Sequence, residues 1–230
     1  MMQNPIYRIN NLVFSYKDKK NVTINKFELH RGAVYLFSGS MGSGKSSLMK
    51  ILSKHIDIND TDSIFYEDQD LSKIKISDYN KEIYFLERNN KVPWLSISAK
   101  NYMIKRIKVY SKDNYNNIFK RICNSMKISS EILNSNLSSL SEGELRWIEI
   151  SIAIAVDTKV LIVDYLEKSL DLNRRIILNR ILKRKASHDG VTVIASTYNL
   201  DFFKMSASVS IKMDRGRITQ VRSLTNSKSK

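Results

Sequence analysis

Residues 39–47, which read GSMGSGKSS, decide the fold expected for the rest of this chain. Their spacing is G-x-x-x-x-G-K-S, the pattern of a loop whose backbone N–H groups surround phosphate. An apolar run at residues 33–37 precedes the loop and a helical pattern at residues 48–52 follows it, which is the strand–loop–helix context that the motif requires. The predicted phosphate-binding residues are Gly39, Ser40, Met41, Gly42, Ser43, Gly44, Lys45, Ser46 and Ser47.

Two side chains of this loop have a predicted chemical role. Lys45 would reach the β- and γ-phosphates of a nucleotide, and the Ser46 hydroxyl would bind Mg²⁺. The glycines let the backbone approach phosphate closely, and the N-terminus of the following helix adds a partial positive charge.

Composition places the chain among globular proteins. Its 230 residues suit one large domain, and a hydrophobic content of 42% is enough for a substantial core. No apolar run approaches the roughly 20 residues of a membrane span, and Gln3, Asn4 and Pro5 stand where a signal peptide would be apolar. A single cysteine, Cys123, is typical of a reducing compartment. We expect a soluble, intracellular protein.

The formal net charge of +15 favours anionic partners, which include nucleic acid, an acidic lipid surface and an acidic protein. Compositional drift is an equal alternative, because Lys, Asn and Ile are abundant throughout and the basic residues form no dense block outside the C-terminal tail.

The N-terminal third is predicted to contain an antiparallel pair of strands. Residues 7–14 and 22–29 alternate partly between apolar and polar side chains, with a polar turn between them. Short strands are expected at residues 63–66 and 83–86, and a polar loop at residues 68–78.

The remainder alternates between helical and strand patterns. Residues 98–134 are helical in pattern, and another helix is expected from Ser141, whose side chain would cap it while Glu144 returns the capping bond. A further helix is expected at residues 174–185, and strands at residues 160–163, 191–195, 209–213 and 217–221. This alternation predicts an α/β fold with a mostly parallel sheet and an antiparallel β-subdomain at one edge.

A second motif supports the first. Residues 160–164 read VLIVD, a buried strand that would bring Asp164 to the rim of the site, where such an Asp holds Mg²⁺, usually through water. No catalytic or metal role is expected for the scattered histidines His30, His55 and His188.

Between the two motifs, residues 140–144 read LSEGE, which resembles the L-S-G-G-Q signature of ATP-binding cassette (ABC) ATPases. Tyr16 matches the aromatic residue that stacks on adenine in that family, and Glu87 falls where its Q-loop glutamine is expected. Residues 92–95, VPWL, resemble the segment after the Q-loop, and residues 169–171, SLD, resemble the D-loop.

The resemblance covers nearly the whole chain and implies one cassette, with a phosphate-loop core over residues 1–222, a helical subdomain at about 96–156 and a basic flexible tail at 223–230. It also implies a head-to-tail pair of cassettes with ATP between the phosphate loop of one and the signature of the other. The residues implied in nucleotide binding outside the loop are Tyr16, Ser141, Gly143 and Asp171, and those implied in Mg²⁺ binding are Ser46, Asp164 and Glu87.

The sequence departs from the family at its two most catalytic positions. Tyr165 follows Asp164 where the family has a catalytic Glu, and Tyr198 stands where the family has its switch His. A phenol is protonated at neutral pH and is a poor base. Glu167 lies two residues further on and should not reach the same point. Glu87 and Glu142 replace a glutamine and a glycine of the family, and each adds a negative charge.

The leading interpretation is the ATP-binding subunit of an ABC transporter with weak ATP hydrolysis. It implies ATP and Mg²⁺ as cofactors, a second cassette and transmembrane permease subunits as partners, and a cytoplasmic location at the inner face of a membrane. Nucleic acid is not expected as a partner. The alternatives are a soluble assembly factor like the iron–sulfur assembly ATPase, which Glu144 and residues 148–150 faintly resemble, and a non-hydrolysing ATP-gated interaction module.

Overall fold

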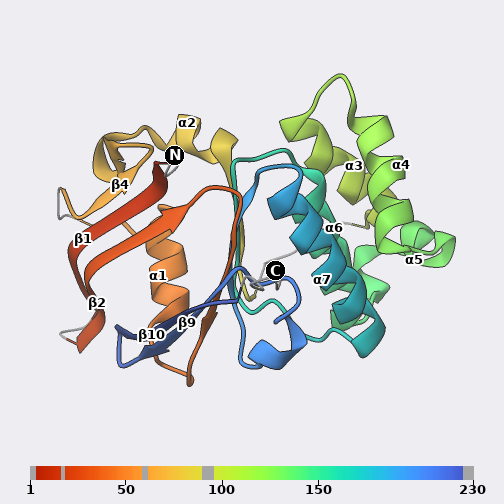
Figure 1. Ribbon diagram of the computed structural model, residues 1–230. Helices are drawn as coiled ribbons and strands as arrows, with labels where there is room; N and C mark the ends of the chain where they lie inside the picture. Colours follow the sequence, from red (N-terminus) through yellow and green to blue (C-terminus); the bar gives the residue numbers. More distant parts are fainter. Residues whose placement is uncertain (1–3, 17–18, 59–61, 90–95, 225–230) are drawn as a thin grey trace, which may run out of the picture.

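The protein is represented by a computed structural model that describes residues 4–16, 19–58, 62–89 and 96–224. Two β-sheets and a group of helices build it (Figure 1). Within these residues, no helix is both long and apolar enough to cross a membrane.

The N-terminal sheet is antiparallel, with the strand order β2-β1-β4-β5. It confirms the predicted antiparallel β-subdomain, although its first two strands are longer than the sequence pattern indicates. The four strands are β1 (Pro5–Tyr16), β2 (Lys19–His30), β4 (Ile64–Tyr66) and β5 (Gln69–Asp70).

The second sheet has six strands in the order β10-β9-β3-β8-β7-β6, and β10 is antiparallel to the five parallel strands beside it. The predicted mostly parallel sheet is therefore confirmed. The strands are β3 (Val34–Ser38), β6 (Ile83–Leu86), β7 (Val160–Val163), β8 (Thr192–Ser196), β9 (Val209–Asp214) and β10 (Arg217–Ser223).

Helix α1 lies between the two sheets, and α6 and α7 lie against the opposite face of the parallel sheet, with α3 and α4 packed beyond them (Figure 1). The helices are α1 (Lys45–Leu52), α2 (Ile76–Glu82), α3 (Ala99–Tyr110), α4 (Tyr115–Met126), α5 (Ser130–Asn134), α6 (Glu142–Ala155) and α7 (Leu172–Ser187). Helices α3 to α6 occupy most of the predicted helical subdomain.

The prediction of a polar loop at residues 68–78 is wrong. This stretch contains β5, a 3₁₀ turn (Leu71–Lys73) and the first residues of α2. Asp70 accepts hydrogen bonds from the backbone N–H and the hydroxyl of Ser72, and the side chains of Leu71 and Tyr79 are buried. A few buried anchors and one cap therefore order a segment whose composition is mostly polar.

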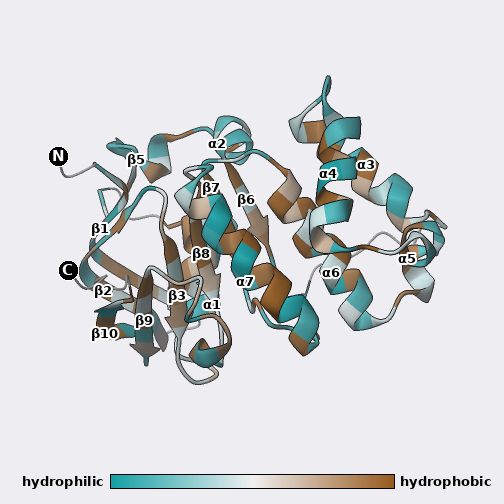
Figure 2. Ribbon diagram, turned by 45° about the vertical axis from the view of Figure 1, so that its right-hand side comes forward, coloured by the Kyte–Doolittle hydropathy of each residue, from teal (hydrophilic) through white to brown (hydrophobic). Residues whose placement is uncertain are grey.

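The parallel sheet separates two hydrophobic cores. Successive side chains of a strand point to opposite faces, and β3 shows this directly. Val34 and Leu36 belong to the core under α3, α4, α6 and α7, whereas Tyr35 and Phe37 belong to the core around α1. Figure 2 shows the hydrophobic strands of this sheet behind α7, whose outer surface is partly hydrophilic.

One buried arginine joins the helices to the parallel sheet. Arg146 of α6 is 3% exposed, and its guanidinium donates hydrogen bonds to the carbonyl of Glu87 at 2.7 Å and to the carbonyls of Asp164 and Tyr165 at 2.8 and 3.1 Å. Burial lowers the pKa of Arg146, and the carboxylate of Glu149, 3.6 Å away, opposes that shift. Because the three carbonyls follow β6 and β7, Arg146 sets the position of both strand ends.

We expect Arg146→Met to lower the free energy of unfolding by about 3–5 kcal/mol, because it breaks the buried ion pair with Glu149 and removes donors from three carbonyls. Chemical denaturation measures this change. Adding Glu149→Met should recover part of the loss. Arg121→Met, at an exposed position of α4, is the matched control and should change stability by no more than about 0.5 kcal/mol. Equal stability of the Arg146 and Arg121 variants would contradict this role.

Candidate functional site

The glycine-rich loop joins β3 to α1 and has a path that only glycine permits at two points. Gly39 and Gly44 have φ angles of 144° and 97°, in the region that side chains disfavour. A Cβ atom on Gly39 would lie 2.2 Å from the carbonyl oxygen of Met213, and one on Gly44 would lie 2.5 Å from that of Asn21. The loop is therefore held by close backbone contacts and leads directly into the N-terminus of α1.

Lys45 begins α1 and turns back over this loop. Its ammonium donates to the carbonyls of Gly39 and Ser40 at 2.8 and 2.9 Å and to the Ser43 hydroxyl at 2.9 Å. Burial lowers the pKa of Lys45, and the nearby Asp164 carboxylate opposes the shift. These bonds place the positive charge at the centre of the loop, where a phosphate group would meet it.

A pocket of about 230 Å³ opens beside Lys45. Seven of the nine predicted loop residues border it; Gly39 and Ser40 instead supply carbonyls that hold Lys45. The lining residues are Asn21, Met41, Gly42, Ser43, Gly44, Lys45, Ser46, Ser47, Arg88 and Tyr198.

Asp164 follows β7 and is 4% exposed. Its carboxylate accepts a hydrogen bond of 2.6 Å from the hydroxyl of Ser196, the last residue of the neighbouring strand β8. The Ser196 hydroxyl in turn accepts a bond of 2.7 Å from the backbone N–H of Tyr165. The Asp164 carboxylate is thus fixed between two adjacent strand ends.

The oxygen groups at this edge of the sheet fit Mg²⁺. The described residues contain no cluster of three or more His, Cys, Asp or Glu that could hold a metal on its own. Mg²⁺ commonly takes one or two protein carboxylates and completes its shell with water and substrate phosphates, so one carboxylate with the Ser46 hydroxyl is a suitable donor set.

Glu87 is less directly placed for a metal. Its carboxylate forms an ion pair of 2.6 Å with Lys50 of α1, and its carbonyl accepts from Arg146. Lys50 therefore already engages one oxygen of this carboxylate, and the predicted Mg²⁺ role of Glu87 stays a prediction.

Tyr165 and Tyr198, which stand where the sequence differs from the family pattern, are in contact. The rings of Tyr165 and Tyr198 lie 5.0 Å apart at 85°, an edge-to-face arrangement. The guanidinium carbon of Arg88 lies 4.7 Å from the centre of the Tyr165 ring and 5.7 Å from that of Tyr198. A terminal nitrogen of Arg88 donates to the Tyr198 hydroxyl at 3.1 Å. The sequence did not indicate that the two rings touch or that Arg88 lies against both, because no local pattern brings these three positions together.

Glu167 is buried and binds backbone N–H groups of the loop after β8. It is 5% exposed, and its carboxylate accepts the backbone N–H groups of Tyr198 and Asn199 at 2.6 and 3.3 Å. These bonds shape the loop after β8. The sequence-based expectation is that Glu167 reaches the position of the family's catalytic Glu only with a local rearrangement, and it stays a prediction.

The signature segment lies at the start of α6, where Ser141 and Glu144 form the predicted capping box. The Glu144 carboxylate accepts from the Ser141 backbone N–H at 2.9 Å, and the Ser141 hydroxyl accepts from the Glu144 N–H at 3.3 Å. A Cβ atom on Gly143 would lie 2.5 Å from the Ser169 carbonyl oxygen, so the signature packs closely on the D-loop.

The signature is also connected to Arg88 through the ammonium group of Lys168. Glu142 pairs with Lys168 at 2.9 Å, and Lys168 donates to the carbonyl of Arg88 at 3.0 Å and to the side chain of Asn89 at 2.9 Å. Asp171 caps α7 by accepting from the Arg174 N–H at 2.9 Å. Ser141, Gly143 and Asp171 do not border the pocket beside Lys45.

Some predicted features fall outside the described structure. The side chain of Tyr16, residues 92–95 and residues 225–230 belong to this group. Strand β10 continues to Ser223, so the described fold extends just into the predicted tail.

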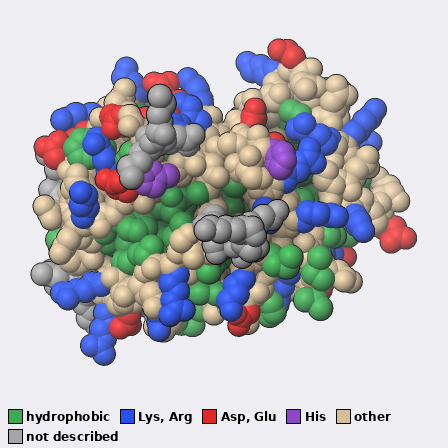
Figure 3. All heavy atoms as spheres, viewed as in Figure 1, with side chains coloured by type: hydrophobic (Ala, Val, Ile, Leu, Met, Phe, Trp, Pro, Cys, Tyr) green, Lys and Arg blue, Asp and Glu red, His purple; other side chains and the backbone are tan. Residues whose placement is uncertain are grey.

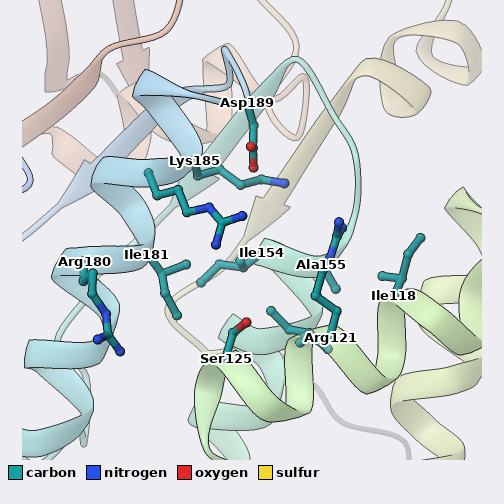
Figure 4. A pocket seen from close by; sticks show the side chains of 11 residues that line it. Ile118, Arg121, Ser125, Ile154, Ala155, Arg180, Ile181, Lys185 and Asp189 are labelled. Carbon is teal, nitrogen blue, oxygen red and sulfur yellow. The ribbon is translucent and has the colours of Figure 1, made fainter.

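A second pocket, of about 380 Å³, lies among α4, α6 and α7 (Figure 4). Arg121, Arg180 and Lys185 line it together with Asp189. Ala155 and Asp189 precede β7 and β8, so this pocket lies at the amino ends of the strands, whereas the phosphate loop lies at the carboxyl ends. It is not part of the candidate site.

The comparisons with known proteins agree with this geometry. The family model described as "ABC transporter" matches residues 22–165. The phosphonates import ATP-binding protein PhnC of Fusobacterium nucleatum is 25% identical, over 93% of this chain and 90% of that protein. The probable iron export ATP-binding protein FetA of Escherichia coli is 23% identical, over 87% of this chain and 88% of that protein.

Solved structures share the fold. A bacterial ABC transporter cassette, solved as a dimer, superposes with a TM-score of 0.83 at 17% identity, covering 96% of this chain and 99% of that one. The match of the family model over most of the chain, together with the phosphate loop, Asp164 and the signature in their expected places, shows that this chain belongs to the ABC transporter family as an ATP-binding cassette.

Proposed function

We propose that this chain binds Mg-ATP as the nucleotide-binding subunit of an ABC transporter and hydrolyses it slowly. The observation that carries the proposal is the pocket formed by the glycine-rich loop, Lys45 and the start of α1, with Asp164 held at the end of β7. The loop N–H groups, the helix N-terminus and Lys45 would neutralise the phosphates, and Tyr16 would contact the adenine. Asp164 and Ser46 would hold Mg²⁺, which supplies further positive charge to the phosphates.

We further propose that a second cassette completes the site. Ser141 and Gly143 lie at the N-terminus of a long helix and do not border the chain's own pocket, which suits a role toward a nucleotide bound by a partner. Asp171 begins the next helix, and the D-loop before it contacts Gly143. The dimeric cassette with the same fold supports this arrangement.

Support for a membrane partner comes from the relatives, which are named as import or export ATP-binding proteins. We propose transmembrane permease subunits as partners and a peripheral position at the cytoplasmic face of a membrane. The net charge of +15 would suit an anionic membrane surface, and Figure 3 shows Lys and Arg side chains spread over the face in view. The cassette would comprise residues 1–222, with the helical subdomain at about 96–156.

We expect Lys45→Ala to abolish Mg-ATP binding, because Lys45 is the central cation of the loop. ATP at 100 times its Kd adds roughly 2.7 kcal/mol to the stability of a protein that binds it only when folded. Thermal unfolding with and without Mg-ATP measures the effect. An equal rise in melting temperature for the native protein and the variant would exclude this site.

We expect Ser141→Arg to leave ATP binding by the isolated chain unchanged and to reduce ATP hydrolysis by the assembled complex. The reason is that Ser141 lies away from the chain's own pocket. Nucleotide titration of the purified chain and phosphate release from the complex measure the two effects. Loss of ATP binding by the isolated variant would contradict the head-to-tail arrangement.

We expect steady-state phosphate release from the native chain to be far slower than about 1 s⁻¹, the low end of usual enzyme turnover. A positioned general base supplies a factor of roughly 10²–10⁴, and Tyr165 is a poor base. Tyr165→Glu combined with Tyr198→His should raise the rate, and Tyr165→Glu alone should raise it less. A native turnover near 1 s⁻¹, at a concentration that permits dimers, would contradict the weak-hydrolysis proposal.

A further inference from the structure

Arg88 is a cation at the phosphate-loop pocket that the proposed function does not use. It follows β6 and Glu87, and it lines the same pocket as Lys45 and Tyr198. Among the residues that the structure describes, no carboxylate lies within ion-pair distance of its guanidinium. Its polar side-chain contact is the Tyr198 hydroxyl, a neutral group.

Two aromatic rings hold the guanidinium in place. It lies over the faces of Tyr165 and Tyr198, whose edge-to-face contact braces one ring against the other. The backbone is fixed as well, because the Arg88 carbonyl accepts from Lys168 and the preceding carbonyl accepts from Arg146. These contacts leave the Arg88 side chain few rotamers, so it loses little further conformational entropy when it binds a ligand.

Two cations line the pocket and lie near the same aromatic ring. The Lys45 ammonium lies 4.9 Å from the centre of the Tyr198 ring, which Arg88 also approaches at 5.7 Å. The ring lies against both cations, and its π-face attracts positive charge. A phosphate that entered between Lys45 and Arg88 would receive charge-assisted hydrogen bonds from both.

We propose that Arg88 binds the terminal phosphate of the nucleotide held by its own chain, and that Tyr165 and Tyr198 are positioning residues that hold its guanidinium over the loop. This inference rests on the proposed function of the site. A guanidinium is planar, stays charged and can contact two phosphate oxygens through two separate nitrogens, whereas a side-chain amide has one donor nitrogen and no charge. The two tyrosines would then serve nucleotide binding, although they are unsuited to activating water. Because only ATP carries a third phosphate, Arg88 should distinguish ATP from ADP.

The test is calorimetric titration of the full chain with Mg-ATP and with Mg-ADP. We expect Arg88→Gln to weaken ATP binding at least about tenfold, or about 1.4 kcal/mol, and to change ADP binding by less than about threefold. The matched control is Arg180→Gln, which also removes one positive charge. Arg180 lies on α7 and lines the pocket at the amino ends of the strands, away from the phosphate loop. This variant should change neither affinity.

Variants of Tyr165 test the positioning role. Tyr165→Leu removes the ring beneath the guanidinium and should weaken ATP binding several-fold with little effect on ADP, whereas Tyr165→Phe keeps the ring and should bind both nucleotides like the native chain. Combining Tyr165→Leu with Arg88→Gln should give no further loss of ATP affinity, because the ring acts through the arginine. Melting temperatures without nucleotide show whether each variant is folded.

The outcomes separate this inference from the proposed function. Equal losses of ATP and ADP affinity in Arg88→Gln, or no loss at all, would overturn the role of Arg88 while ATP binding by the native chain stands. Additive losses from Tyr165→Leu and Arg88→Gln would overturn the positioning role. If neither nucleotide bound the native chain, the proposed function itself would fail.

Discussion

The Arg146 guanidinium holds together the parts of the site that come from different layers of the fold. It is a charged group inside the protein, and such a group is tolerated only when its donors are used. Here the two terminal nitrogens of Arg146 donate to the carbonyls of Glu87, Asp164 and Tyr165, and the carboxylate of Glu149 lies 3.6 Å away. The helix that carries the signature segment therefore has a fixed position relative to the strand ends that precede Arg88 and carry Asp164 and Tyr165.

Around this centre, charged and aromatic contacts connect the residues at which the sequence differs from the family pattern. Lys168 joins Glu142 of the signature to the backbone of Arg88, and Arg88 lies against Tyr165 and Tyr198. Glu167 fixes the loop that carries Tyr198 through its backbone N–H groups. The departures from the family pattern are thus one connected group in space, and several of its members lie far apart in the sequence.

Much of the fold could be predicted because its signals are local. The phosphate loop, the VLIVD strand and the Ser141 capping box each depend on neighbours within a few residues, and all three form as expected. The loop predicted at residues 68–78 failed for the opposite reason. Leu71 and Tyr79 order this segment by packing into a core that strands distant in the sequence complete. The mostly polar composition of residues 68–78 does not indicate that packing.

The sequence by itself determined the chemistry available at the site: glycines that permit the loop, a lysine and a serine at the start of a helix, an aspartate after an apolar strand, and tyrosines where the family has Glu and His. Only the tertiary structure decided which of these groups meet. Arg88, Tyr165 and Tyr198 come together because β6, β7 and β8 are adjacent parallel strands whose carboxyl ends share one edge. Contacts of that kind depend on strand order, which long-range pairing sets and which no short stretch of sequence contains.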